Sequence, residues 1–132
     1  MENKVICLDT SILIDYFRKT NKQNAFLTDL IDRYDQFAVS VITEFEIYSG
    51  ATEQQIEFWD HFFQQIEILP LDSNAIQQAS LLFKQLKAQN KLIDMPDLFI
   101  AATAITNDLT LATLNVKHFN RIEQLELITK SA

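Results

Sequence analysis

The sequence alternates between short apolar segments and longer segments with helical spacing, and this alternation restricts the fold more than any other feature. Residues 5–8 form a continuous apolar run that ends at Asp9, a pattern typical of a strand covered on both faces. Further strands are predicted by comparable runs at 37–42, 67–71, 109–114 and 125–128.

Apolar residues between these runs recur at the three- and four-residue spacing of amphipathic helices. Strands that alternate with helices favour right-handed crossovers and a mainly parallel sheet with helices on both faces. We therefore expect an α/β fold, a three-layer α/β/α sandwich with four or five strands. The expected helices follow Asp9, begin at Thr43 and Glu53, and cover residues 22–35, 74–90 and 95–107.

The composition favours a single domain over residues 1–132. Gly50 is the only glycine and the chain has two prolines, so no flexible linker divides it. Cys7 is the only cysteine, which excludes an intrachain disulfide and a cysteine-rich zinc site. No apolar run is long enough for a signal peptide or a membrane span, so we expect a cytoplasmic protein without membrane contact.

The charge balance is acidic, with 11 Lys and Arg against 18 Asp and Glu and a net charge of −7. Indiscriminate coating of nucleic acid depends on basic side chains that neutralise phosphates, so this mode of binding is disfavoured. A negatively charged substrate would need a cation as mediator.

Acidic residues occur near three predicted helix starts. Because ligands of a parallel sheet sit at the carboxyl ends of its strands, Asp9, Glu46 and Asp97 are expected to converge there. Helix capping is the alternative for each: Asp9 as an N-cap, Thr43 with Glu46 as a capping box, and Asp94 with Asp97 as cap and third residue. Capping explains each acid separately but not why all should meet at one edge.

Converging carboxylates repel one another unless a cation lies between them. Mg²⁺ prefers oxygen ligands and keeps waters that a phosphate can displace, and it can activate water toward a phosphodiester. Asn115 follows the fourth predicted strand and offers a neutral oxygen, although a turn role is the alternative. The hydroxyls of Thr10, Ser11 and Thr113 lie beside the expected site and can orient its carboxylates, with capping as the alternative for Ser11.

Four segments together resemble the ordered motifs of PIN-domain ribonucleases, and most closely those of VapC-type toxins from bacterial toxin-antitoxin pairs. They occur in the family's order, and the resemblance spans nearly the whole chain. The segments are LDTSILID at 8–15, SVITEFEIYSG at 40–50, DLFIAATA at 97–104 and TLNVKHF at 113–119.

The resemblance implies that Asp9, Glu46 and Asp97 bind Mg²⁺ or Mn²⁺, with Glu44 and Asp94 as second choices for the last two. Asn115 matches a family position that carries Asn or Asp. His118 stands where many members carry another acid, so three acids with Asn115 are expected to hold one metal.

The basic residues of the last motif are candidates for phosphate contacts. Lys117, His118 and Arg121 follow the fourth predicted strand, although a solvated basic turn explains them equally well.

The resemblance implies a metal-dependent endoribonuclease that acts as the toxin of a toxin-antitoxin pair, with RNA as substrate, a cognate antitoxin and a homodimeric state. A catalytically decayed PIN-like module that binds RNA or protein is the main alternative, because of His118. A phosphotransfer domain shares the sheet but needs a second acid beside Asp9, where this chain has Leu8 and Ser11.

Overall fold

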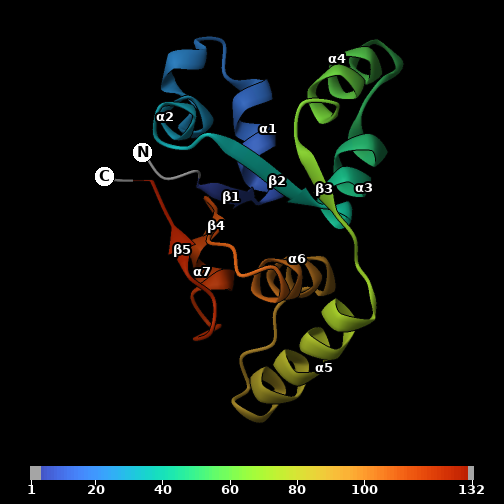
Figure 1. Ribbon diagram of the computed structural model, residues 1–132, viewed down its shortest axis with the longest axis vertical. Coiled ribbons are helices and arrows are strands. Elements are labelled where there is room, and N and C mark those ends of the chain that lie inside the picture. Colours follow the sequence, from blue (N-terminus) through green and yellow to red (C-terminus); the bar gives the residue numbers. More distant parts are fainter. Residues whose placement is uncertain (1–3, 131–132) are drawn as a thin grey trace.

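A parallel five-stranded sheet runs through the computed structural model, which describes residues 4–130 (Figure 1). Every strand pair is parallel, and the spatial order is β3-β2-β1-β4-β5. The α/β fold with a parallel sheet is therefore confirmed. The strands are β1 (Val5–Leu8), β2 (Gln36–Ser40), β3 (Glu67–Leu69), β4 (Leu111–Ala112) and β5 (Leu127–Ile128).

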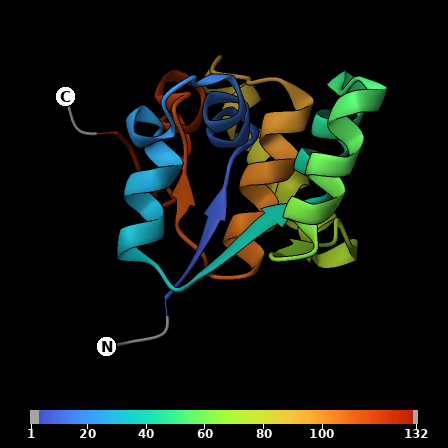
Figure 2. The same cartoon turned by 90° about the horizontal axis from the view of Figure 1, so that it is seen from above.

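Helices cover both faces of the sheet, with α1 to α4 on one side and α5 to α7 on the other (Figures 1 and 2). Within residues 4–130, none of them combines the length and apolar character needed to cross a bilayer. The helices are α1 (Thr10–Arg18), α2 (Phe26–Arg33), α3 (Val41–Gly50), α4 (Glu53–Phe63), α5 (Ser73–Ala88), α6 (Met95–Thr106) and α7 (Val116–Phe119), with a 3₁₀ turn η1 (Lys22–Asn24).

The central strand β1 serves two cores at once. Ile6 and Leu8 pack with α1 to α4, whereas Cys7 points to the opposite face and packs with α5 and α6. All three side chains are fully buried, because successive residues of a strand point to opposite faces and both faces are covered. This explains why the strand is apolar throughout.

The order in which strands are added to the sheet reverses between β1 and β4, although all strands remain parallel. Strands β2 and β3 extend the sheet from one side of β1, and β4 then returns to its other side. The backbone N–H of Asp9 donates to the carbonyl of Ala112 at 2.9 Å, so the carboxyl ends of β1 and β4 lie together. Ligand sites of open parallel sheets occupy such switch points.

Helix α3 begins two residues earlier than the sequence predicted. The Ser40 hydroxyl accepts a hydrogen bond from the backbone N–H of Ile42 at 3.0 Å and caps the helix, which ends β2 at Ser40. Thr43 therefore lies within the first turn, and the predicted capping box of Thr43 with Glu46 is wrong. Glu46 has no capping role to perform.

The other predicted boundaries differ because of local chain turns. The predicted helix 22–35 divides into η1 and the shorter α2. Strand β4 starts later than predicted because α6 ends in a hydrogen-bonded reversal: Asp108 adopts a left-handed conformation with φ 58°, and Leu109 donates its N–H to the carbonyl of Ala104 at 2.9 Å. Asp and Asn tolerate this conformation better than other non-glycine residues.

Replacing the helix cap tests the observed start of α3. Ser40→Ala removes the acceptor for the Ile42 N–H and is expected to lower the free energy of unfolding by about 1 kcal/mol, measured by urea denaturation. Ser49→Ala, an exposed change in the same helix, should stay within about 0.5 kcal/mol of the parent. Equal stability of both variants would contradict the cap.

Candidate metal centre

Asp9 is the most enclosed acid of the site and follows β1 directly. Only 3% of it is exposed, and its Oδ2 accepts hydrogen bonds from the hydroxyls of Ser11 at 2.6 Å and Thr113 at 2.8 Å. Asp9 makes no side-chain capping bond to α1, so capping does not account for its carboxylate. Ser11, for which capping was the alternative, instead donates to this carboxylate.

The loop after β4 aims both hydroxyls at Asp9. The backbone N–H of Leu114 donates to Ser11 Oγ at 3.1 Å, and that of Asn115 donates to Thr113 Oγ1 at 2.8 Å. Because an ionised carboxylate only accepts hydrogen bonds, each hydroxyl donates its own hydrogen to Asp9. Asp9 Oδ2 is thereby held in place, and Oδ1 remains available to a ligand.

Glu46 approaches from α3 and is oriented by a hydroxyl of α1. Thr10 Oγ1 donates to Glu46 Oε1 at 2.7 Å and lies 3.0 Å from the hydroxyl of Thr43. Thr43 and Glu46 are three residues apart and so share one helix face. The role of Thr43 was missed by the sequence prediction, although its spacing from Glu46 was the available signal.

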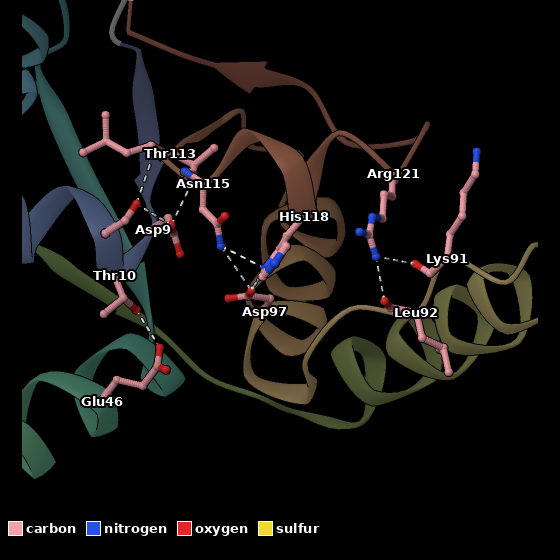
Figure 3. Close-up of polar contacts among 12 residues, drawn as sticks. Asp9, Thr10, Glu46, Lys91, Leu92, Asp97, Thr113, Asn115, His118 and Arg121 are labelled. Carbon is pink, nitrogen blue, oxygen red and sulfur yellow. Dashed lines mark hydrogen bonds and ion pairs between the residues drawn. The ribbon is translucent and has the colours of Figure 1, made fainter.

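Asp97 lies in the first turn of α6 and meets two side chains from the region after β4 (Figure 3). Its Oδ2 is 2.8 Å from His118 Nδ1 and 3.5 Å from Asn115 Nδ2, and these two nitrogens are 2.9 Å apart. Asp94 is the N-cap residue of α6, as predicted, but its side chain makes no capping bond. Asp94, Asp97 and His118 can present ligand atoms within 4.8 Å of one another.

Burial and mutual repulsion act on the carboxylates in the same direction. The pKa of Asp9 is raised chiefly by burial, and the charge of Asp97 adds to this, while the hydroxyls of Ser11 and Thr113 oppose it. Burial likewise raises the pKa of Glu46, with further contributions from Asp97 and Asp9. The three carboxylates are therefore close enough to interact electrostatically, although they come from different elements.

The donor set fits a hard divalent cation. Carboxylate and amide oxygens are preferred ligands of such ions, and Asp9, Glu46, Asp97 and Asn115 supply them. Within residues 4–130, no Lys or Arg forms an ion pair with any of the three acids. A bound cation would offset the repulsion that raises their pKa values.

The remaining predicted site residues lie around this centre or away from it. Arg121 donates to the backbone carbonyls of Leu92 at 2.8 Å and Lys91 at 3.5 Å, and Figure 3 shows its side chain apart from the acids. Lys117 is exposed on α7. His61 is exposed on α4, because the aromatic stripe of that helix turns another face inward.

The comparisons with known proteins give the family. The model of the PIN domain matches residues 6–125, which is most of the chain. The protein therefore belongs to the PIN-domain family, as the resemblance of its motifs implied.

Two relatives are similar over nearly the full length. Ribonuclease VapC1 of Methanocaldococcus jannaschii is 36% identical over 127 residues, which cover 96% of this chain and 87% of the relative. Ribonuclease VapC19 of Mycobacterium tuberculosis is 29% identical over 119 residues, covering 90% and 95%.

Solved structures agree with this result. The chain is similar to VapBC-1 from nontypeable Haemophilus influenzae, with a TM-score of 0.84, 26% identity and coverage of 95% of this chain and 97% of the other. It is also similar to VapBC2 from Rickettsia felis, solved bound to a DNA fragment from its promoter, with a TM-score of 0.82, 26% identity and coverage of 96% and 99%.

The raised pKa values predict how the metal-free protein responds to pH. A carboxyl whose pKa is higher in the folded state keeps its proton longer there, so the free energy of unfolding falls as the pH rises. For Asp9 and Glu46, the free energy of unfolding begins to fall near the ordinary pKa values of 3.8 and 4.5, and it stops falling once the pH exceeds the raised pKa values. With EDTA present, the Tm should therefore fall between mildly acidic and neutral pH.

Asp9→Asn should make the fall in Tm with rising pH smaller and should raise the Tm at neutral pH. The substitution removes the buried charge, while the amide oxygen can still accept both hydroxyl hydrogen bonds. Differential scanning calorimetry of both proteins at matched pH values gives the comparison. An unchanged pH response, or a lower Tm of the variant at neutral pH, would show that ionised Asp9 does not strain the metal-free fold.

Proposed function

We propose that the protein is a metal-dependent endoribonuclease in which Asp9, Glu46 and Asp97 hold Mg²⁺ or Mn²⁺ and Asn115 supports them. The observation that carries this proposal is the mutual electrostatic interaction of three carboxylates near the switch point of the sheet, where burial and repulsion raise the pKa of two of them; among the described residues, the ligand atoms grouped within 4.8 Å of one another are those of Asp94, Asp97 and His118. Membership of the PIN family and similarity to ribonucleases of the VapC type support the same activity.

The cation, when bound, supplies Lewis-acid activation of water and of the phosphodiester, and offsets charge on the leaving oxygen. The chain's own residues provide the positioning. Asp9 is held through Oδ2 by two hydroxyls and Glu46 through Oε1 by Thr10, so one oxygen of each carboxylate remains for the ion. A carboxylate of this group takes the proton of the attacking water, and cleavage leaves 5′-phosphate and 3′-hydroxyl ends.

RNA binding by an acidic protein follows from this site. The net charge of −7 disfavours indiscriminate attraction of phosphates, so affinity depends on the cation and on local basic groups. Lys117 and His118, on α7 beside the acids, are the proposed phosphate contacts, His118 through Nε2 because its Nδ1 faces Asp97 at 2.8 Å. Arg121 already donates to two backbone carbonyls and is the weakest member of the predicted set.

We also propose a cognate antitoxin as a regulatory partner and a homodimeric state. Solved relatives of similar fold are described as toxin-antitoxin complexes, including one from Klebsiella pneumoniae with 26% identity and a TM-score of 0.77, which covers 94% of this chain and 96% of the other. A pocket among α1, α3 and α4 runs beside the site and is lined by Phe17, Arg18, Glu46 and Trp59, among others. An antitoxin segment seated there would reach Glu46.

A decayed, noncatalytic PIN-like module is the second candidate, favoured by His118 in place of an acid. It predicts binding of RNA or protein without cleavage. The acids are nevertheless all present, hydroxyl groups orient Asp9 and Glu46, and the three carboxylates interact electrostatically, which favours the nuclease.

Substitution of single carboxylates tests the nuclease. Asp97→Asn and Asp9→Asn each remove one negative ligand while keeping shape, and should lower cleavage of a fluorescent single-stranded RNA by at least about 100-fold. EDTA should abolish cleavage by the parent protein, and added Mn²⁺ or Mg²⁺ should restore it.

Glu44→Gln is the matched control, since Glu44 lies in α3 but lines a different surface pocket. Its cleavage rate should equal that of the parent. Circular dichroism must show the same fold in all three variants. Full activity of Asp97→Asn, or no cleavage by the parent with any divalent ion, would exclude the proposed nuclease.

The hydroxyls that hold Asp9 should matter through metal binding. Ser11→Ala removes one of the two hydrogen bonds to Asp9 Oδ2 and is expected to weaken Mn²⁺ binding by about 10- to 100-fold, as outer-shell partners of metal ligands do. Isothermal titration gives the Kd. Ser49→Ala serves as control, and an unchanged Kd in Ser11→Ala would show that Asp9 needs no such support.

A further inference from the structure

Asp97, His118 and Asn115 form a tight triangle of polar atoms at one side of the metal centre. Its edges are 2.8 Å between Asp97 Oδ2 and His118 Nδ1, 2.9 Å between His118 Nδ1 and Asn115 Nδ2, and 3.5 Å between Asn115 Nδ2 and Asp97 Oδ2. Asp97 is mostly buried, with a side-chain exposure of 16%, whereas His118 remains reachable at 36%. Figure 3 shows the three side chains directed at one another.

A neutral imidazole carries one N–H, so each assignment of hydrogens leaves one edge of this triangle that is not a hydrogen bond. If Nδ1 of His118 bears the hydrogen, it donates to Asp97, but the amino group of Asn115 then faces a second donor. Turning the amide over places its oxygen 3.5 Å from the carboxylate oxygen, so two acceptors face each other. If Nε2 bears the hydrogen, the Nδ1 lone pair faces the carboxylate at 2.8 Å.

A shared cation satisfies all these atoms. Ligands at about 2.1 Å from an octahedral ion lie about 3 Å from their neighbours in the coordination shell. The Asp97–His118 separation of 2.8 Å matches adjacent ligands of one ion, and Asp94 can present an oxygen within 4.8 Å of both. The Nε2–H form of His118 then directs its Nδ1 lone pair at the ion.

We propose that His118 is a nitrogen ligand of the cation that Asp97 binds, and that this nitrogen makes the centre prefer Mn²⁺ to Mg²⁺. Imidazole suits transition metals, whereas Mg²⁺ is best served by oxygen and water. The inference deepens the proposed function and rests on its claim that Asp97 binds the ion. The competing role for His118 is that of a positioning residue, which only hydrogen-bonds to Asp97.

The test observes the metal itself. Tag-free protein with ¹⁵N-labelled histidine is loaded with Mn²⁺, and pulsed electron paramagnetic resonance measures the hyperfine coupling of a directly coordinated nitrogen. The chain has only two histidines, so His61→Gln, a change at an exposed position of α4, is the matched control and should keep the coupling. His118→Gln should lose it.

Isothermal titration with Mn²⁺ and with Mg²⁺ gives a second readout. In the parent and in His61→Gln, Mn²⁺ should bind more tightly than Mg²⁺. His118→Asp restores an all-oxygen donor set and should reduce this preference by about tenfold or more. Circular dichroism confirms that each variant is folded.

The outcomes separate the inference from the proposed function. If Mn²⁺ binds, depends on Asp97 and shows no nitrogen coupling, His118 is only a positioning residue and the inference is overturned while the nuclease proposal stands. An unchanged Mn²⁺ to Mg²⁺ preference in His118→Asp overturns it as well. If neither ion binds the parent protein, or if Asp97→Asn binds both normally, the metal site of the proposed function fails too.

Discussion

The hydrogen bonds that hold the Asp9 carboxylate connect the end of β1 with the loop that follows β4. Asp9 follows the central strand directly, and the Thr113 hydroxyl that donates to it lies 104 residues further along the chain. The same hydroxyl accepts from the backbone N–H of Asn115, so the path of the loop after β4 depends on this contact. That loop leads to Asn115 and His118, which face Asp97. Support of one buried carboxylate thus also positions the opposite side of the site.

The site combines firm support of the acids with electrostatic strain among them. Hydroxyl groups orient Asp9 and Glu46, while burial and neighbouring charge raise the pKa of both. Such an arrangement is costly for the metal-free fold and favourable once a cation is bound, since the ion removes the repulsion and uses oxygens already in place. The acidity of the chain is in this way compatible with a polyanionic substrate.

Much of the architecture could be predicted from local pattern. Apolar runs and helical periodicity are properties of neighbouring residues, so the parallel sheet, its two helical layers and the order of elements followed from them. The boundaries did not, because Ser40 rather than Thr43 caps α3 and Asp108 ends α6 with a left-handed turn. Several neighbouring residues could begin or end each helix, and the hydrogen bonds formed in the folded chain decide which of them does.

The sequence by itself determined which residue types are available to the site and the family to which they belong: Asp9, Glu46, Asp97 and Asn115 lie in motifs with the order and spacing of the PIN domain. Only the tertiary structure decided how they are used. It placed β4 beside β1, assigned the hydroxyls of Ser11 and Thr113 to Asp9, and set His118 2.8 Å from Asp97. Some of these contacts join residues that are far apart in the chain, and others select one of several possible partners within a segment. Both depend on packing that the local sequence does not specify.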